Sequence, residues 1–176
     1  MNRLTTDRLI LSPITEIDFS DIHEMHCFSE VAKYNTIGIP KNLLETSTML
    51  TKVMANPDKR VWMIRGKNEG VNIGEIGMTL SSAKYAKGEI YYNLHPNFWG
   101  QGFGSEALKA IVCYGFEALN LHRIEAGVAV ENAKSVRVLE KARMRREGTC
   151  RKILPLETGW MDNYMYAILN TDARDY

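Results

Sequence analysis

Apolar residues divide the chain into segments of two different periods. Positions that recur every three or four residues, as on one face of a helix, predict helices at residues 18–28, 42–56, 105–119 and 131–142. Alternation of apolar and polar residues predicts strands at residues 8–14, 60–66, 71–80, 88–94, 124–130, 147–154 and 160–169. The strands within 60–94 follow one another through short turns, as in an antiparallel meander. We therefore expect one α+β domain that spans residues 1–176.

The helical segments also predict which residues face the core. In 105–119 the apolar face contains Leu108, Ile111, Val112, Gly115, Phe116 and Leu119. In 42–56 it is expected to contain Leu43, Leu44, Leu50, Val53 and Met54. Asp18 and Asn132 stand at the starts of the first and last helices, where a short polar side chain can cap free backbone amides.

The amino-acid composition limits which binding partners and which cellular compartment we expect. Lys and Arg number 22 against 21 Asp and Glu, a net charge of +1, whereas a general nucleic-acid surface needs a basic excess. Cys27, Cys113 and Cys150 are odd in number and form no CxxC pair, which indicates reduced thiols. No apolar run reaches the roughly 18 residues of a membrane span. We expect a cytoplasmic protein without nucleic-acid or membrane partners.

Three glycines precede the strongest predicted helix. Gly100, Gly102 and Gly104 occupy alternate positions, where glycine permits positive φ and a close approach of the backbone to a ligand. The free amides at a helix start, together with the helix dipole, attract anions. We therefore expect Gln101 to Glu106 to bind phosphate or pyrophosphate through main-chain amides. A plain tight turn before a helix is the alternative.

Two other phosphate-binding motifs fit these glycines poorly. A Walker loop needs Gly-Lys before Ser or Thr, but Ser105 follows Gly104 directly. A dinucleotide fingerprint, G-x-G-x-x-A, does run from Gly102 to Ala107, and Glu131 ends the next strand. That fold requires a tight turn from strand to helix, whereas residues 95–99 intervene here. Too little chain also follows Glu131 to complete a doubly wound sheet.

Three longer segments carry a family resemblance. The segments TTDRLILSPIT, GEIYYNLHPNFWGQGFGSEAL and LHRIEAGVAVENAKSVRVLEKA together resemble the GNAT superfamily of N-acetyltransferases, with the closest match in its RimJ/RimL-like branch of protein N-terminal acetyltransferases. The resemblance implies a twisted, mostly antiparallel sheet of about seven strands flanked by about four helices. It also implies acetyl-coenzyme A (acetyl-CoA) as donor, no metal, and a primary amine as acceptor.

The resemblance assigns the cofactor to particular residues. The pyrophosphate would lie on the amides of Gln101, Gly102, Phe103, Gly104, Ser105 and Glu106. The pantetheine arm would pair with Tyr92, Asn93 and Leu94 like an added strand, since a free strand edge exposes unpaired N–H and C=O groups. Asn132 and Ser135 would lie beside the thiol end.

Acetyl transfer needs a base for the amine, donors for the oxyanion and a proton for the leaving thiolate. Glu89 matches a glutamate that works through water in related enzymes, although a solvated strand-end residue is the alternative. Ser135 aligns with a serine near the thiolate, or is simply a first-turn helix residue. Backbone amides near Asn93 and Leu94 are the expected oxyanion donors. Many relatives carry a tyrosine acid where this chain has Leu139.

Other features depart from the family pattern or carry weaker signals. The acid that RimL-type enzymes place after EGT falls at Leu154, which argues against a ribosomal substrate. The usual Gly-Phe at the helix end is Arg143-Met144, and loss of that glycine costs about 1 kcal/mol unless the helix closes differently. His23 and His26 are three apart, but without a third ligand we expect surface histidines rather than a metal site.

The acceptor is the least determined part of the prediction. The aromatic candidates to line its groove, which fit a core equally well, are Tyr85, Tyr91, Tyr92, Trp62, Trp160 and Tyr164. We expect a protein or peptide N-terminal amine, in a monomer or homodimer, with specificity set by residues 28–60 and 155–160. A small amine such as a polyamine, amino acid or drug is one alternative, and a non-catalytic acyl-CoA-binding module is another.

Overall fold

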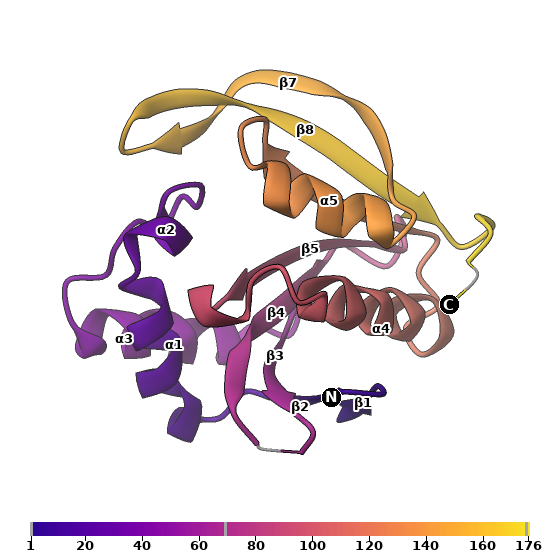
Figure 1. The fold of residues 1–176 in the computed structure, drawn as a ribbon. Coiled ribbons are helices and arrows are strands. Elements are labelled where there is room, and N and C mark those ends of the chain that lie inside the picture. The colour runs from indigo at the N-terminus through magenta and orange to yellow at the C-terminus, as the bar shows by residue number, and fades with distance from the viewer. Residues whose placement is uncertain (1, 69, 175) are drawn as a thin grey trace.

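A single eight-stranded sheet forms the centre of the molecule (Figure 1). The computed structural model describes residues 2–68, 70–174 and 176. The strands are β1 Leu4–Thr5, β2 Leu9–Pro13, β3 Lys59–Gly66, β4 Asn72–Leu80, β5 Lys87–Leu94, β6 Arg123–Ala129, β7 Arg145–Leu156 and β8 Gly159–Leu169. Their order across the sheet is β1-β2-β3-β4-β5-β6-β8-β7, and the pairings are antiparallel except for β5 with β6. This confirms the predicted α+β fold with a mostly antiparallel sheet.

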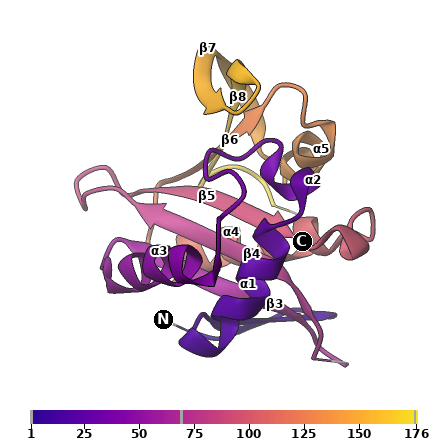
Figure 2. The ribbon, with the colours of Figure 1, turned by 90° about the vertical axis from the view of Figure 1, so that its left-hand side faces the viewer.

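Helices cover both faces of the sheet (Figure 2). They are α1 Phe19–His26, α2 Ser29–Ala32, α3 Leu43–Ala55, α4 Phe103–Glu117 and α5 Ala133–Lys141, with short 3-10 helices η1 Glu16–Asp18 and η2 Pro96–Phe98. One hydrophobic core lies between the sheet and α4 and α5. A smaller core lies on the opposite face, beneath α1 and α3. Because each face has its own core, residues that alternate along a central strand serve different environments.

The four longer helices and the predicted strands are confirmed, with small shifts of their ends. Helix α4 begins at Phe103 because Gly102 is its N-cap, two residues before the predicted start. The N-cap role of Asn132 is confirmed by its Oδ1, which accepts from the Ser135 amide at 3.1 Å. Asp18 precedes α1 as predicted, but its carboxylate instead accepts from the Thr15 amide and pairs with Arg65. Strand β1 and helix α2 were not predicted, since such short segments show no period.

The predicted buried face of α3 is wrong in part. Leu44 is 75% exposed, and Leu43 and Met54 are exposed as well. The predicted Leu50 is buried, together with Thr46, which was not predicted. Thr46 can be buried because its hydroxyl Oγ1 lies 2.8 Å from Nδ1 of His23 on α1. A hydrogen-bonded polar residue therefore occupies a buried position at the helix interface. The hydrophobic pattern alone assigned burial to a leucine that is exposed.

The middle of the sheet opens into two parts. Strands β5 and β6 pair in parallel only through Lys87–Glu89 and Arg123–Glu125. Beyond Glu89, β5 continues beside β4, whereas β6 continues beside β8. The two strands therefore separate after Glu89, and Figure 1 shows α5 over the side on which they part. We call this opening the β5–β6 separation.

Candidate functional site

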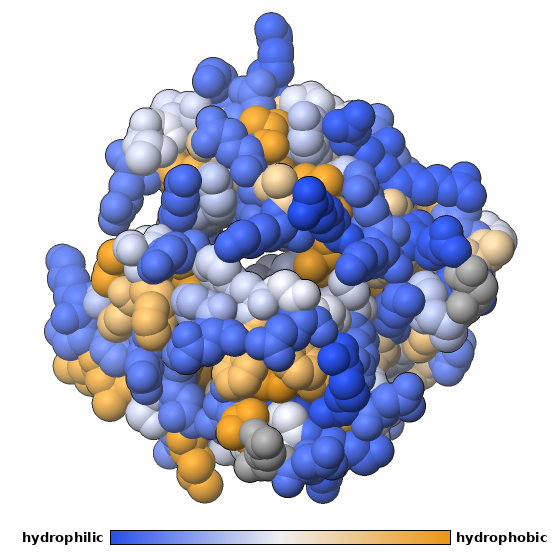
Figure 3. Space-filling view, viewed as in Figure 1, coloured by the Kyte–Doolittle hydropathy of each residue, from blue (hydrophilic) through white to orange (hydrophobic). Residues whose placement is uncertain are grey.

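The β5–β6 separation ends at the start of α4. From Leu94 the chain passes through η2 and then reaches Gly102, the N-cap of α4, whose φ is +85°. Gly100 also has a positive φ of +77°. A side chain at either position would strain the backbone. The surface view in Figure 3 is hollowed between the part that contains α5, β7 and β8 and the part that contains α4.

The glycines leave free amides at the first turn of α4. The amide of Glu106 donates to the Gly102 carbonyl at 3.1 Å, so the helical ladder begins there. The amides of Phe103, Gly104 and Ser105 precede this ladder. Gly104 also allows close packing, since a Cβ there would lie 3.1 Å from Cδ1 of Leu94. These residues fit a pyrophosphate group, because amides and the helix dipole both favour an anion.

The Glu106 carboxylate is held by Thr6 and Arg8. It accepts from Thr6 Oγ1 at 2.5 Å, from the Arg8 amide at 2.9 Å and from Arg8 Nε at 2.7 Å. Burial alone would raise the pKa of this carboxyl, but these hydrogen bonds outweigh burial and hold the pKa below its usual range. The charge of Glu106 is therefore compensated by the chain itself.

Arg8 is a site residue that sequence reasoning missed. Its Nη1 donates to the Gln101 carbonyl at 3.1 Å, and its guanidinium lies 4.5 Å from the centre of the Phe103 ring. The guanidinium thus lies directly beside the glycine-rich turn. A signal was present, because Arg8 belongs to one of the segments that carry the family resemblance, but no local pattern indicates a role for it.

Tyr92 and Ser135 meet across the β5–β6 separation. The Tyr92 hydroxyl lies 2.6 Å from Ser135 Oγ and 3.2 Å from the Ser135 carbonyl oxygen, so its one hydrogen can be donated to either oxygen. Burial raises the pKa of the Tyr92 phenol well above its usual range, although the bond to Ser135 acts in the opposite direction. The phenol is therefore protonated at neutral pH. Leu139, where many relatives carry a tyrosine, is buried in the core.

The end of β5 lies very close to β4. A Cβ added at Gly74 on β4 would collide with the carbonyl oxygen of Asn93, so Gly74 allows the two strands to approach closely here. The Leu94 carbonyl already accepts from the Trp99 indole Nε1 at 2.8 Å. The free groups at this edge are therefore fewer than the sequence alone suggests.

Glu89 lies where β5 and β6 begin to separate. It is exposed, and it pairs in register with Thr79 on β4 and Glu125 on β6. Because residues four apart on a strand share a face, Glu89 and Asn93 point to the side covered by α1 and α3. They are about 13 Å apart along an extended strand, so Glu89 reaches a group beside Asn93 only through water or through movement.

The remaining candidate side chains divide between core and surface. Trp62 is fully buried in the α4-side core, which excludes it from an acceptor groove, whereas Tyr85 and Trp160 are exposed. The prediction that His26 is a surface residue is wrong, because its side chain is 1% exposed and bonds to Glu75. No cluster of three or more His, Cys, Asp or Glu that could hold a metal is found among the described residues.

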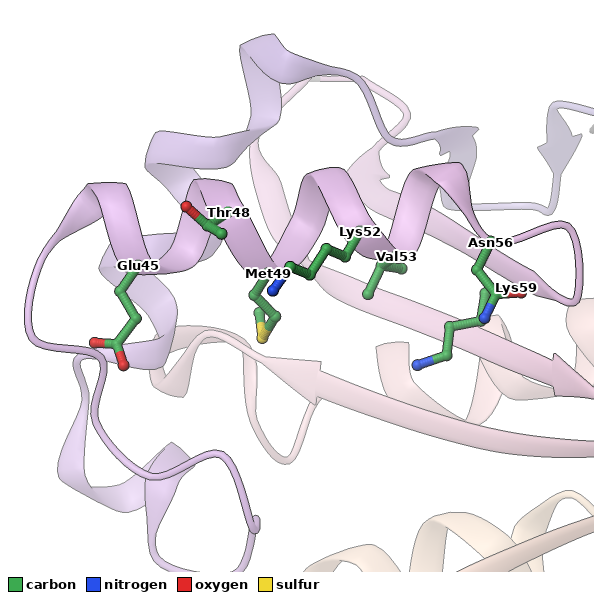
Figure 4. Close-up of a pocket in the computed structure, with 7 residues that line it drawn as sticks. All are labelled: Glu45, Thr48, Met49, Lys52, Val53, Asn56 and Lys59. Carbon is green, nitrogen blue, oxygen red and sulfur yellow. The ribbon is translucent and has the colours of Figure 1, made fainter.

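A separate surface hollow of about 560 Å³ runs along α3 (Figure 4). Its lining residues are Glu45, Thr48, Met49, Lys52, Val53, Asn56 and Lys59. None of these described residues belongs to the predicted cofactor or catalytic set. Within the described part of the chain, no helix is long and apolar enough to cross a membrane.

Comparison with known proteins agrees with this geometry. The family model described as the acetyltransferase (GNAT) domain matches residues 8–145. The chain is 34% identical over 173 residues to Bacillus subtilis YnaD, named an uncharacterized N-acetyltransferase, covering 96% of this chain and 98% of that protein. Bacillus subtilis YoaA, named likewise, is 33% identical over 169 residues, covering 94% of this chain and 96% of that protein.

Solved structures give the same result. A Bacillus anthracis acetyltransferase of the GNAT family has a TM-score of 0.87 and 31% identity, covering 97% of this chain and 100% of that chain. A Vibrio cholerae spermidine N-acetyltransferase, in complex with CoA and spermine, has a TM-score of 0.86 and 22% identity, covering 94% and 98%. The fold and the family match define an acyltransferase. The chain belongs to the GNAT family of acetyltransferases, and acetyl-CoA is its acetyl donor.

Proposed function

We propose that this enzyme transfers the acetyl group to a primary amine at the N-terminus of a protein or peptide, as in the RimJ/RimL-like branch. The observation that carries the use of acetyl-CoA in this proposal is the β5–β6 separation, which leads from a free strand edge directly to the free amides of α4. An extended pantetheine arm needs such an edge, and a pyrophosphate needs such a helix start.

The cofactor is placed along this path. The pyrophosphate lies on the amides of Gln101 to Ser105, one residue shorter than the sequence predicts, because the Glu106 amide is part of the helix. The pantetheine arm pairs with Tyr92, Asn93 and the amide of Leu94, since the Leu94 carbonyl is occupied by Trp99. The thioester then lies near Asn93, with Asn132 and Ser135 at its sulfur side.

The reaction proceeds on the face that carries Glu89. The amine loses a proton, through water, to the Glu89 carboxylate, and its nitrogen lone pair attacks the thioester carbon. A backbone amide near Asn93 and Leu94 that does not pair with the pantetheine arm stabilises the oxyanion. When this intermediate collapses, the carbon–sulfur bond breaks and the thiolate leaves with the bonding pair.

Tyr92 and Ser135 supply the proton for the thiolate. If Tyr92 donates to Ser135 Oγ across their 2.6 Å contact, the serine hydroxyl hydrogen is free to point at the sulfur. The Tyr92 phenol stays protonated at neutral pH because burial raises its pKa, so it orients the serine hydroxyl, and the proton that passes to the thiolate is replaced from solvent. This pair takes the role of the tyrosine that Leu139 replaces.

Exposed apolar side chains favour a peptide acceptor. Ile37 and Ile39 lie exposed between α2 and α3, and Trp160 lies exposed at the start of β8. These segments are close, since a Cβ at Gly38 would be 3.5 Å from Oε1 of Glu157. A peptide presents apolar side chains for such a surface, whereas a polyamine presents few. Spermidine is the second candidate, because Escherichia coli spermidine N(1)-acetyltransferase is 22% identical over 78% of this chain.

Thiol release from acetyl-CoA across a panel of amines tests the proposal. The panel contains peptides with a free N-terminus, the same peptides with a blocked N-terminus and an internal lysine, and spermidine. We expect the free peptides to react fastest and the blocked peptides to react slowly. Preference for spermidine would replace the peptide acceptor with the small amine. Binding of acetyl-CoA without turnover on any amine would identify a non-catalytic acyl-CoA-binding module.

A further inference from the structure

A buried polar cluster lies behind the end of β5, on the face covered by α1. His26 Nε2 lies 2.8 Å from Oε1 of Glu75, and Asn93 Nδ2 donates to the same oxygen at 3.1 Å. The side chains of His26 and Glu75 are 1% and 2% exposed. Burying a carboxyl group is unfavourable unless its oxygens are hydrogen-bonded. The cluster connects α1, β4 and β5 at one point.

The hydrogen bonds fix the orientation of both neighbours of Glu75. A carboxylate oxygen only accepts, so His26 carries its proton on Nε2 and Asn93 turns its NH₂ group toward Glu75. The Oδ1 atom of Asn93 must then point away from Glu75. The other ring nitrogen of His26, Nδ1, is buried without a partner among the described residues, which fits a nitrogen that carries no proton.

Asn93 occupies the position at which the amine arrives. It shares a face of β5 with Glu89, and its backbone borders the proposed thioester. The opposite face of β5 is packed against α4 and α5. An amine that releases its proton toward Glu89 therefore approaches from the face that carries the Asn93 side chain.

We propose that Asn93 Oδ1 accepts a hydrogen bond from the acceptor amine, and that His26 and Glu75 are positioning residues that hold this amide in place. The role rests on the proposed function. One N–H of the amine bonds to Oδ1 while its lone pair faces the thioester carbon. The cluster thereby recognises an amine nitrogen that still carries hydrogen, through an atom that does not contact the cofactor.

The first experiment compares Asn93→Ala with wild type, using one free-N-terminus peptide and spermidine as acceptors. The amide side chain is lost while the backbone remains, so we expect kcat/KM for the amine to fall about tenfold. The Kd of acetyl-CoA, measured by calorimetry, should stay within about twofold. An unchanged kcat/KM for both amines would overturn the proposal.

The second experiment separates positioning from structural support. His26→Leu removes the donor to Glu75, and His26→Gln keeps an N–H donor near the Nε2 position. We expect His26→Leu to lower kcat/KM for the amine as Asn93→Ala does, and His26→Gln to recover it to within about threefold of wild type. His23→Leu is the matched control, because His23 lies on the same helix but bonds to Thr46. It should lower the melting temperature without changing amine kinetics.

Each negative result of these experiments refutes a different part of the proposal. If His26→Gln is as impaired as His26→Leu, the ring itself acts and the positioning role is wrong. If His26→Leu lowers only the melting temperature, the cluster is structural. Should His26→Leu not fold, Asn93→Ala decides alone. A wild-type protein that acetylates neither amine nor any other in the panel refutes the proposed function, and an active wild type with unaffected variants refutes only this inference.

Discussion

Arg8, the residue directly before β2, is joined to Glu106 in the first turn of α4, with Arg8 Nε donating to Glu106 Oε2 at 2.7 Å. The pair places a carboxylate near an anion site yet compensates its charge. Without Arg8, Glu106 would repel a pyrophosphate at the same helix end.

The first prediction follows from this pair. Arg8→Met keeps much of the side-chain volume but leaves Glu106 without its cation, so acetyl-CoA should bind about tenfold more weakly. Adding Glu106→Gln to Arg8→Met should recover part of the affinity, since the repulsive charge is then absent. Calorimetric titration of the single and double variants measures both effects. Equal affinities of the single and double variants would show that Arg8 does not act by screening Glu106.

The glycine-rich turn gives the second prediction. Gly102→Asp adds a negative charge at the proposed pyrophosphate site, and acetyl-CoA affinity should fall roughly a hundredfold or more. Gly102→Asn is the matched control, since it has the same shape and the same backbone strain at positive φ without the charge. It should bind more tightly than the Asp variant. Wild-type affinity in a folded Gly102→Asp protein would contradict the assignment, and no binding of NAD is expected.

The third prediction concerns Tyr92 and Ser135. Ser135→Ala and Tyr92→Phe each remove one hydroxyl of the proposed proton path, so each should lower kcat while acetyl-CoA affinity changes little. The double variant should be no worse than the more impaired single variant, because both hydroxyls serve one step. Steady-state kinetics and calorimetry measure these quantities. A change confined to KM would make Ser135 a binding or capping residue instead.

The fourth prediction is a pH profile for Glu89→Gln. A primary amine has a pKa near 10, so only about one molecule in a thousand is unprotonated at pH 7. Gln keeps the shape of Glu89 but removes its basicity, so turnover should fall strongly at pH 7, and the deficit should shrink as pH rises and free amine accumulates. An N-terminal amine, with a pKa near 8, should lose less than a lysine-like amine. A constant deficit from pH 6 to 10 would instead assign Glu89 to positioning.

The fifth prediction concerns the end of α5. Arg143 has a φ of +62°, a left-handed conformation that favours glycine, and the Met144 amide closes the helix on the Leu139 carbonyl at 3.1 Å. Arg143→Gly should therefore raise the free energy of unfolding by about 1 kcal/mol, and the melting temperature by about 2–4 °C. Arg143→Ala removes the same side chain but keeps Cβ, so it should not stabilise. Equal melting temperatures for the two variants would exclude the backbone explanation.

Periodicity predicted the elements well where a long segment faces one core. Helix α4 and the meander β3 to β5 lie close to the expected residues, since their apolar positions carry the packing directly. The periodicity failed to predict burial where a residue is buried because of a polar partner far along the chain. His26 is buried because Glu75, far along the chain, accepts its hydrogen bond, and Thr46 is buried because His23 is beside it. Neither contact can be predicted from the local pattern of apolar and polar residues.

The candidate site also contains features that the local sequence predicts and contacts that it does not predict. The glycines before α4 carry a local signal, so the anion site could be proposed from the sequence. The contacts of Arg8 with Glu106, of Tyr92 with Ser135, and of Asn93 with Glu75 join segments that only the tertiary fold brings together. Pattern reasoning therefore named several of the residues but not the partners that give them their chemistry.

At the separation of β5 from β6, the backbone hydrogen bonding of the sheet is completed only when the acetyl donor binds in the proposed way. Only Lys87–Glu89 and Arg123–Glu125 connect the two parts of the sheet along this line. In the proposed binding mode, a pantetheine arm that pairs with Tyr92 and Asn93 supplies the hydrogen bonds that a neighbouring strand would otherwise supply. Because a ligand bound to the native state alone raises stability with its concentration, resistance to unfolding would follow the acetyl-CoA level around the protein. The stability of the fold would thereby report the concentration of the substrate.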